Sequence, residues 1–102
     1  MTATREELEA YTTQMFAAAG AAIASTLFAA EITWPADTPD RCFEQAWDTA
    51  ITNLREGVAE ILAARGITDT RSVAILQDIA VDGFTNHFTK LNDGWMSQGG
   101  TA

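Results

Sequence analysis

The sequence predicts an all-α protein in which three long amphipathic helices pack as an antiparallel bundle. Apolar residues recur at spacings of three and four along most of the chain, which is the period of a buried helix face. Helix stop and start signals interrupt this pattern twice, near residues 33–38 and 66–69, and no apolar–polar alternation of period two competes with it. We therefore expect helices at about residues 5–32, 39–65 and 70–92.

The first predicted helix begins with a capping-box spacing, since Thr4 is followed three residues later by Glu7. It ends before Pro35, because a residue that precedes proline is pushed out of the α region. The face expected to be buried consists of Leu8, Tyr11, Met15, Ala19, Ala22, Ile23 and Thr26. A second stripe of small residues would let another helix approach closely: Ala18, Ala22, Ser25 and Ala29.

This helix is also the segment to test for membrane insertion, because no charged residue lies between Glu9 and Glu31. Such a stretch is long enough to span a bilayer, which takes about 20 residues. It is dominated by alanine, however, contains several Thr, Ser and Gln residues, and has an acidic N-terminal flank. We therefore expect a buried helix of a soluble protein and no membrane partner.

The second predicted helix, residues 39–65, has the clearest periodicity. Thr38 and Pro39 provide an N-cap and a first helical residue, and Gly66 suits a left-handed C-cap. Its apolar face is Phe43, Trp47, Ala50, Ile51, Leu54, Val58, Ile61 and Leu62.

The third predicted helix, residues 70–92, ends at Asn92-Asp93-Gly94 and is apolar over most of its circumference. One face contains Val73, Leu76, Ala80, Phe84, His87 and Leu91, while Ile75, Ile79, Val81 and Phe88 fall outside it. Because two other helices offer too little surface to cover both sets, we expect Ile75, Ile79, Val81 and Phe88 to mediate self-association, which makes the chain a homodimer. Residues 1–96 would form a single domain, and residues 97–102 a loose tail.

The net charge of the chain limits the classes of partner that it can bind. Fourteen acidic residues stand against six basic ones, so the formal net charge is −8. Direct binding to nucleic acid or to an anionic membrane requires clustered Lys and Arg, which this chain lacks. Electrostatic attraction steers such a protein towards basic surfaces. The alternative is that the charge has no role beyond solubility. The single cysteine, Cys42, fits a reducing compartment and a cytoplasmic protein.

No motif indicates catalysis, a metal site or a cofactor. His87 is the sole histidine and has no Glu-x-x-His spacing, so we expect it to form a hydrogen bond with a neighbouring helix. Cys42 has no histidine near it in sequence and is expected to be structural. Trp34 and Trp95, which lie at element ends, are expected to close the two ends of the bundle; the alternative for either is a binding hot spot.

The sequence therefore predicts a non-enzymatic, protein-binding module. The residues expected to contact a partner are the acids on the polar side of the second helix: Glu44, Asp48, Glu56 and Glu60. In its bulk properties the chain resembles many small phage-encoded inhibitors of host defence, anti-CRISPR proteins among them, which implies occlusion of a basic, nucleic-acid-binding surface of a partner protein. The alternatives are a structural or adaptor subunit that works by self-association, and a small metal-binding protein or enzyme that uses His87.

Overall fold

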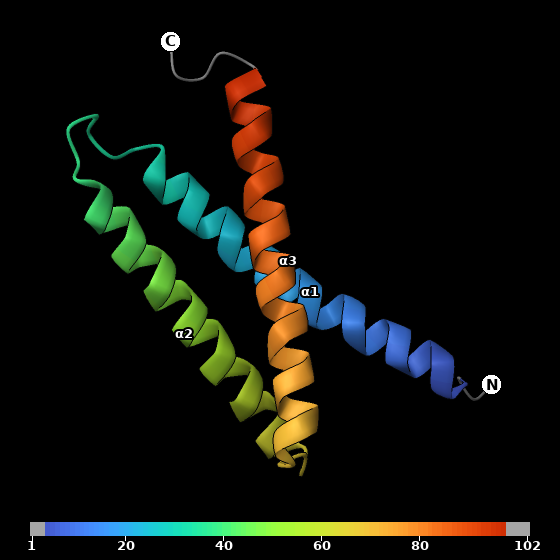
Figure 1. Cartoon of the computed structure of the whole chain (residues 1–102). Coiled ribbons are helices and arrows are strands. Elements are labelled where there is room, and N and C mark those ends of the chain that lie inside the picture. The colour runs from blue at the N-terminus through green and yellow to red at the C-terminus, as the bar shows by residue number, and fades with distance from the viewer. Residues whose placement is uncertain (1–3, 98–102) are drawn as a thin grey trace.

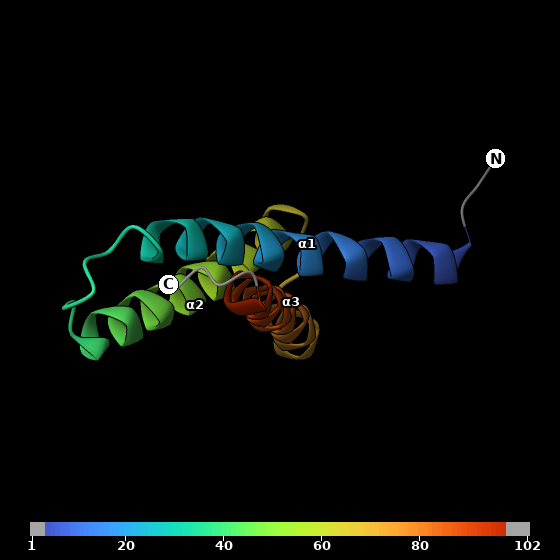
Figure 2. The same ribbon diagram turned by 90° about the horizontal axis from the view of Figure 1, so that it is seen from above.

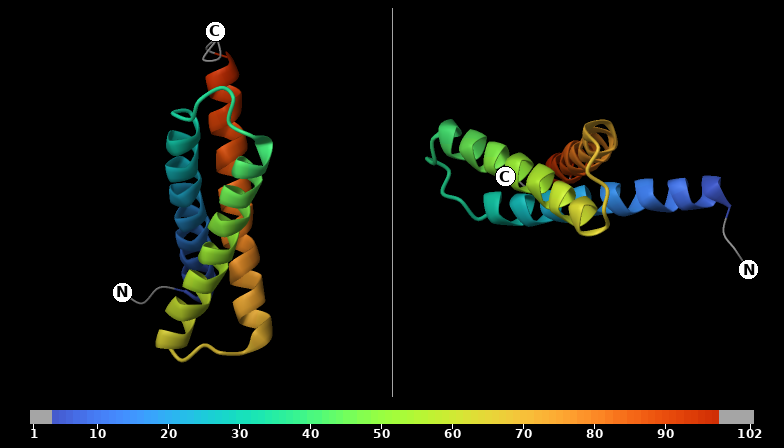
Figure 3. Two further views of the ribbon diagram at one scale, coloured as in Figure 1. Left: turned by 90° about the vertical axis from the view of Figure 1, so that its left-hand side faces the viewer. Right: turned by 90° about the horizontal axis from the view of Figure 1, so that it is seen from below.

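A computed structural model describes residues 4–97 as three helices, α1 (Arg5–Glu31), α2 (Asp40–Ala64) and α3 (Thr70–Ser97) (Figure 1). Within these residues there is no strand, so the predicted all-α helical bundle is confirmed. Figures 1 and 3 show that α2 runs antiparallel to both of its neighbours, whereas α1 and α3 run in the same general direction and cross.

Two helix ends follow from local sequence, whereas the predicted start of α2 is wrong, because the helix begins at Asp40 with Pro39 in the N-cap position and no side-chain cap from Thr38. Thr4 Oγ1 accepts a hydrogen bond from the backbone N–H of Glu7 at 3.1 Å, as the capping spacing predicts. At the end of α2, Gly66 adopts a φ of 80°, and the N–H of Ile67 donates to the carbonyl of Leu62 at 2.9 Å. This is a Schellman C-cap, which favours glycine because the left-handed conformation is strained for residues with a Cβ.

The predicted end of α3 at Asn92 is wrong, because the helix continues to Ser97. The extra turn places Trp95 against Phe28 of α1, with ring centroids 6.2 Å apart in an edge-to-face arrangement. That contact offsets the unfavourable helix propensity of Gly94. Trp34 follows the C-terminus of α1 and Trp95 packs near it, so the two side chains lie at the same end of the bundle rather than at opposite ends. Of the predicted tail, residues 98–102 lie outside the described residues.

An aromatic cluster joins the three helices. The Trp47 ring lies 4.6 Å from Phe84 and 5.1 Å from Phe88, and Phe43 and Phe28 contact Phe88 from α2 and α1. The other buried core residues are Phe16 and Ala24 of α1, Leu54, Val58 and Leu62 of α2, and Ala80 of α3. The predicted apolar face of α2 is thus confirmed in its central part.

The crossing of α1 and α3 depends on two glycines. A Cβ atom on Gly20 would lie 2.7 Å from the backbone nitrogen of Phe84 and closer still to the carbonyl oxygen of Ala80. A Cβ on Gly83 would lie 2.8 Å from Cα of Ala17. The two backbones therefore touch at a point that only glycine permits, which explains why Gly20 interrupts an otherwise alanine-rich helix.

The predicted buried face of α1 is wrong. Phe16, Gly20 and Ala24 are its buried residues, whereas the predicted face is exposed except for half-buried Ile23. Figure 2 shows why, since the N-terminal half of α1 extends beyond α2 and α3. The chain measures 52 × 27 × 16 Å, and its radius of gyration of 16.2 Å exceeds the ~13 Å of a compact domain of this size.

Candidate functional site

Of the four acidic residues predicted to bind a partner, two lie together beside an aromatic surface. Glu44 and Asp48 are exposed and line a hollow of about 490 Å³ with Phe43, Trp47 and Phe88. The aromatic residues come from the seam between α2 and α3, and each carboxylate follows an aromatic residue in sequence. We call these five residues the acidic–aromatic hollow.

The other two predicted acids do not belong to this hollow. Glu56 and Glu60 are also exposed, but at 100° per residue they lie about a third of a turn further around α2 than Glu44 and Asp48. The four carboxylates therefore do not form one continuous binding surface.

The floor of the hollow is rigid because its rings pack against one another. Trp47 lies edge-to-face with Phe84 and with Phe88, and Phe43 packs against both Trp47 and Phe88. Phe43 and Trp47 remain half-buried, so part of each ring faces solvent. An aromatic surface beside two carboxylates is chemically suited to a cation such as a guanidinium or ammonium group.

Glu44 and Asp48 are not neutralised by the ion pairs seen among residues 4–97. These pairs are Arg5–Glu9 at 3.0 Å within α1 and Arg55–Asp78 at 3.2 Å between α2 and α3. The second is reinforced by a hydrogen bond from Gln77 Nε2 to the carbonyl of Arg55 at 2.9 Å. This polar seam connects α2 with α3 and does not involve the carboxylates of the hollow.

The residues predicted to mediate self-association divide into two groups. Ile75 is 50% exposed, and together with half-buried Ile79 it lines a groove between α3 and the N-terminal half of α1. Val81 is half-buried against the core, and Phe88 is only 8% exposed within the aromatic cluster. The expectation that Phe88 finds no partner surface within the chain is wrong, because Phe28, Phe43 and Trp47 surround it.

His87 has the role that its position predicts. Its Nε2 atom lies 3.0 Å from Ser25 Oγ, so it forms a hydrogen bond between α3 and α1. Within residues 4–97 no group of three His, Cys, Asp or Glu side chains is arranged to hold a metal ion. Cys42 is half-buried and lines a groove between the C-terminal half of α1 and the N-terminal half of α2.

Two carboxyl groups have shifted pKa values. Burial at the end of α1 raises the pKa of Glu31. Hydrogen bonds from Ser72 lower the pKa of Asp69, whose Oδ2 accepts from the backbone N–H of Ser72 at 3.0 Å and caps α3. Neither residue lies in the acidic–aromatic hollow.

Among the described residues, α1 is the one helix long and apolar enough to cross a membrane. This is weak support for a membrane span, because a core helix or a signal sequence passes the same test. The chain matches no family model, no curated protein and no solved structure with which it was compared.

The sequence predicts Glu44 and Asp48 as binding residues but does not predict the aromatic surface beside them. By their spacing alone, Phe43 and Trp47 belong entirely to the core. The signal that distinguishes them is that each is followed directly by an acid, so that both pairs lie at the edge of the apolar face, where rings can be buried on one side and exposed on the other.

Proposed function

We propose that this chain is a non-enzymatic binding module that recognises a basic surface of a partner protein through the acidic–aromatic hollow. The observation that supports the proposal is the position of two exposed carboxylates, Glu44 and Asp48, beside the partly exposed ring of Trp47. An arginine or lysine of the partner would lie over the aromatic floor and form charge-assisted hydrogen bonds with the carboxylates. Rigid aromatic anchors of this kind are typical of interface hot spots.

The net charge of −8 would add long-range attraction to the local contacts. A partner surface that binds nucleic acid carries the lysines and arginines which this hollow suits. By covering that surface the chain would act as an inhibitor, in the manner of small phage-encoded inhibitors of host defence. The site of action is then the cytoplasm, where such partners operate.

Matched charge reversals test the site. Each of two double variants, Glu44→Lys with Asp48→Lys and Glu56→Lys with Glu60→Lys, reverses two carboxylates and so changes the net charge by the same amount. The probe is a fluorescently labelled arginine-rich peptide, followed by anisotropy at low and high salt. We expect the first variant to weaken binding at least tenfold more than the second, and wild-type binding to fall with salt.

Equal weakening by the two variants would show that only net charge matters and would refute the site. If the first variant weakens binding more, the natural partner can be identified by capture from a host lysate. The proteins captured by the wild-type chain and by the first variant are compared by mass spectrometry. A protein captured equally by both would have to bind elsewhere.

A structural or adaptor role through self-association is the second candidate. It is favoured by a different surface, the N-terminal half of α1, where Leu8, Tyr11 and Met15 are exposed. The two functions are compatible because the acidic–aromatic hollow lies near the N-terminus of α2, whereas the exposed apolar residues lie near the N-terminus of α1.

A further inference from the structure

Three large apolar side chains in the N-terminal half of α1 point away from the core. Leu8 is 56% exposed, Tyr11 62% and Met15 48%. At 100° per residue these three lie within about 60° of one another and, on average, about 150° from the buried Phe16, Gly20 and Ala24. We call Leu8, Tyr11 and Met15 the outer ridge of α1.

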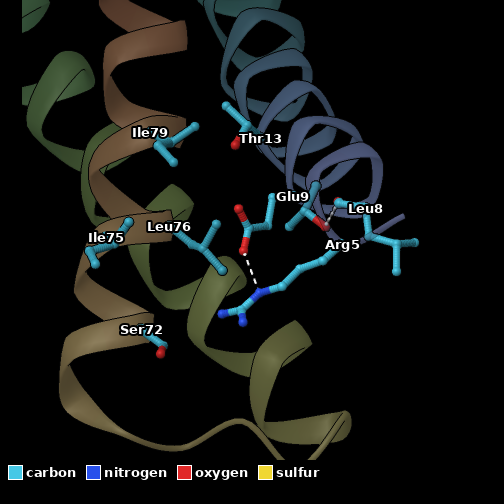
Figure 4. Close-up of a pocket in the computed structure, with 9 residues that line it drawn as sticks. Arg5, Leu8, Glu9, Thr13, Ser72, Ile75, Leu76 and Ile79 are labelled. Carbon is cyan, nitrogen blue, oxygen red and sulfur yellow. Dashed lines mark hydrogen bonds and ion pairs between the residues drawn. The ribbon is translucent and has the colours of Figure 1, made fainter. Parts of the chain in front are cut away.

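Two grooves lie beside this ridge, at successive levels along α1. Near the N-terminus of α1, the helix and the beginning of α3 border about 660 Å³, with Ile75, Leu76 and Ile79 as an apolar wall. Figure 4 shows Ile79 and Leu76 pointing from α3 toward α1, with the Arg5–Glu9 pair extending from α1 into the space between the helices and Leu8 at the outer edge. Closer to the middle of α1, Met15 and Ile61 line an apolar groove of about 230 Å³ between α1 and α2.

We propose that a second copy of this chain covers the N-terminal half of α1, with the outer ridge of each copy lying in the groove between α1 and α3 of the other. A two-fold interface must be self-complementary, so the same patch has to contain both a projection and a recess. The outer ridge is the projection, and the groove walled by Ile75, Leu76 and Ile79 is the recess. The inference does not rest on the acidic–aromatic hollow, which lies on α2 and α3.

The chain exposes more surface than a compact monomer of its mass. The chain exposes 7217 Å², whereas a compact monomer of its mass would expose about 5,600 Å². A standard interface buries about 800 Å² on each partner, which is roughly half of that excess. Burying the outer ridge would therefore bring the surface of each copy towards that of an ordinary globular protein.

Charge favours the same occupant. Each copy has a net charge of −8, but no charged residue lies between Glu9 and Glu31, so Tyr11 and Met15 can meet a second copy without burying like charges. Beside Leu8, Glu9 is already paired with Arg5 at 3.0 Å. The acids of α2 lie on a different helix. The seam of the outer ridge also continues along α1 with alternating spacings of three and four through Ala18, Ala22, Ser25 and Ala29, a period that suits a second helix.

Light scattering on the full chain tests the proposal. We expect the wild-type protein at about 100 µM to have twice its chain mass of 11.0 kDa. Met15→Asp should reduce this to the mass of one chain, with unchanged helix content by circular dichroism. Met96→Asp is the matched control, because Met96 is 54% exposed on the last turn of α3, away from the ridge, and it should leave the dimer intact.

The dimer should persist or tighten in 0.5 M NaCl, since salt screens the repulsion between two acidic chains. A wild-type chain of monomer mass, or a Met15→Asp variant that remains a dimer, would overturn the proposal. So would a monomer that cosediments with neutral phosphatidylcholine vesicles, because α1 would then be covered by lipid. None of these results bears on the peptide-binding test of the acidic–aromatic hollow.

Discussion

The close crossing of α1 and α3 makes Gly20 the position where one added methyl group has the largest predictable effect. In a Gly20→Ala variant the new Cβ would overlap the carbonyl oxygen of Ala80 and lie 2.7 Å from the nitrogen of Phe84. Both obstacles are backbone atoms, so no side-chain rotation relieves the overlap. The helices must separate or one of them must bend.

The size of the effect follows from two opposing contributions. Alanine in place of glycine in a helix interior stabilises by about 0.5–1 kcal/mol, because the unfolded chain loses less entropy on folding. Forcing an extra methyl into a filled site typically costs about 1–3 kcal/mol, and contact with rigid backbone favours the upper end. We expect a net loss of about 2 kcal/mol, which lowers the Tm of a domain of this size by roughly 10 °C.

Thermal unfolding followed by circular dichroism at a fixed protein concentration measures this loss. Gly57→Ala is the matched control, because no atom lies within 4 Å of the position that its Cβ would occupy, and the same substitution there should raise the Tm by a few degrees. Gly83→Ala should destabilise like Gly20→Ala, and the double variant should lose less than the sum, since either methyl already separates the helices. A Gly20→Ala variant as stable as Gly57→Ala would refute the crossing.

Two further predictions concern charge at helix ends. Burial raises the pKa of Glu31, so the ionised carboxylate opposes folding. The protonated carboxyl contributes stability below its ordinary pKa, and this contribution is lost as pH rises through the pKa of the folded state. Glu31→Gln should therefore raise the Tm slightly at pH 7, because the side chain is largely exposed and solvent screens its charge, and should change the Tm little at pH 3. Conversely, hydrogen bonds from Ser72 lower the pKa of Asp69, so its contribution is present above its ordinary pKa and is lost as pH falls through the folded value. Asp69→Asn, which keeps a capping side chain, should lose less Tm than the wild type between pH 7 and pH 3, and identical losses would contradict the assignment.

The helices themselves were predictable from sequence because their limits are local. The Thr4 cap and the Gly66 C-cap depend on residues within one turn, and both form as expected. The end of α3 was not predictable in this way. Asn92-Asp93-Gly94 is a local stop signal, and it is overridden by a contact of Trp95 with Phe28, which is distant in sequence.

The buried face of α1 was harder to predict because the helix is rich in alanine. Alanine lies on every side of the helix, so periodicity is set by a few large residues, and Leu8, Tyr11 and Met15 suggested a buried face. The contact that decides the orientation is made by Gly20, the residue with no side chain. A hydrophobic pattern does not identify a residue such as Gly20, which is buried because it lacks a side chain.

The same crossing connects the fold with both proposed surfaces. Since α1 and α3 touch at Gly20 and Gly83, they meet near their middles and diverge towards their N-termini, which leaves the outer ridge of α1 without a partner in the chain (Figure 1). Towards the other end, α2 fills the space beside α3 and forms the aromatic floor on which Glu44 and Asp48 stand. Salt separates the two surfaces experimentally, because screening weakens attraction to a basic partner and relieves repulsion between acidic copies. A single salt titration that loosens peptide binding while the dimer holds would show that the two surfaces act independently.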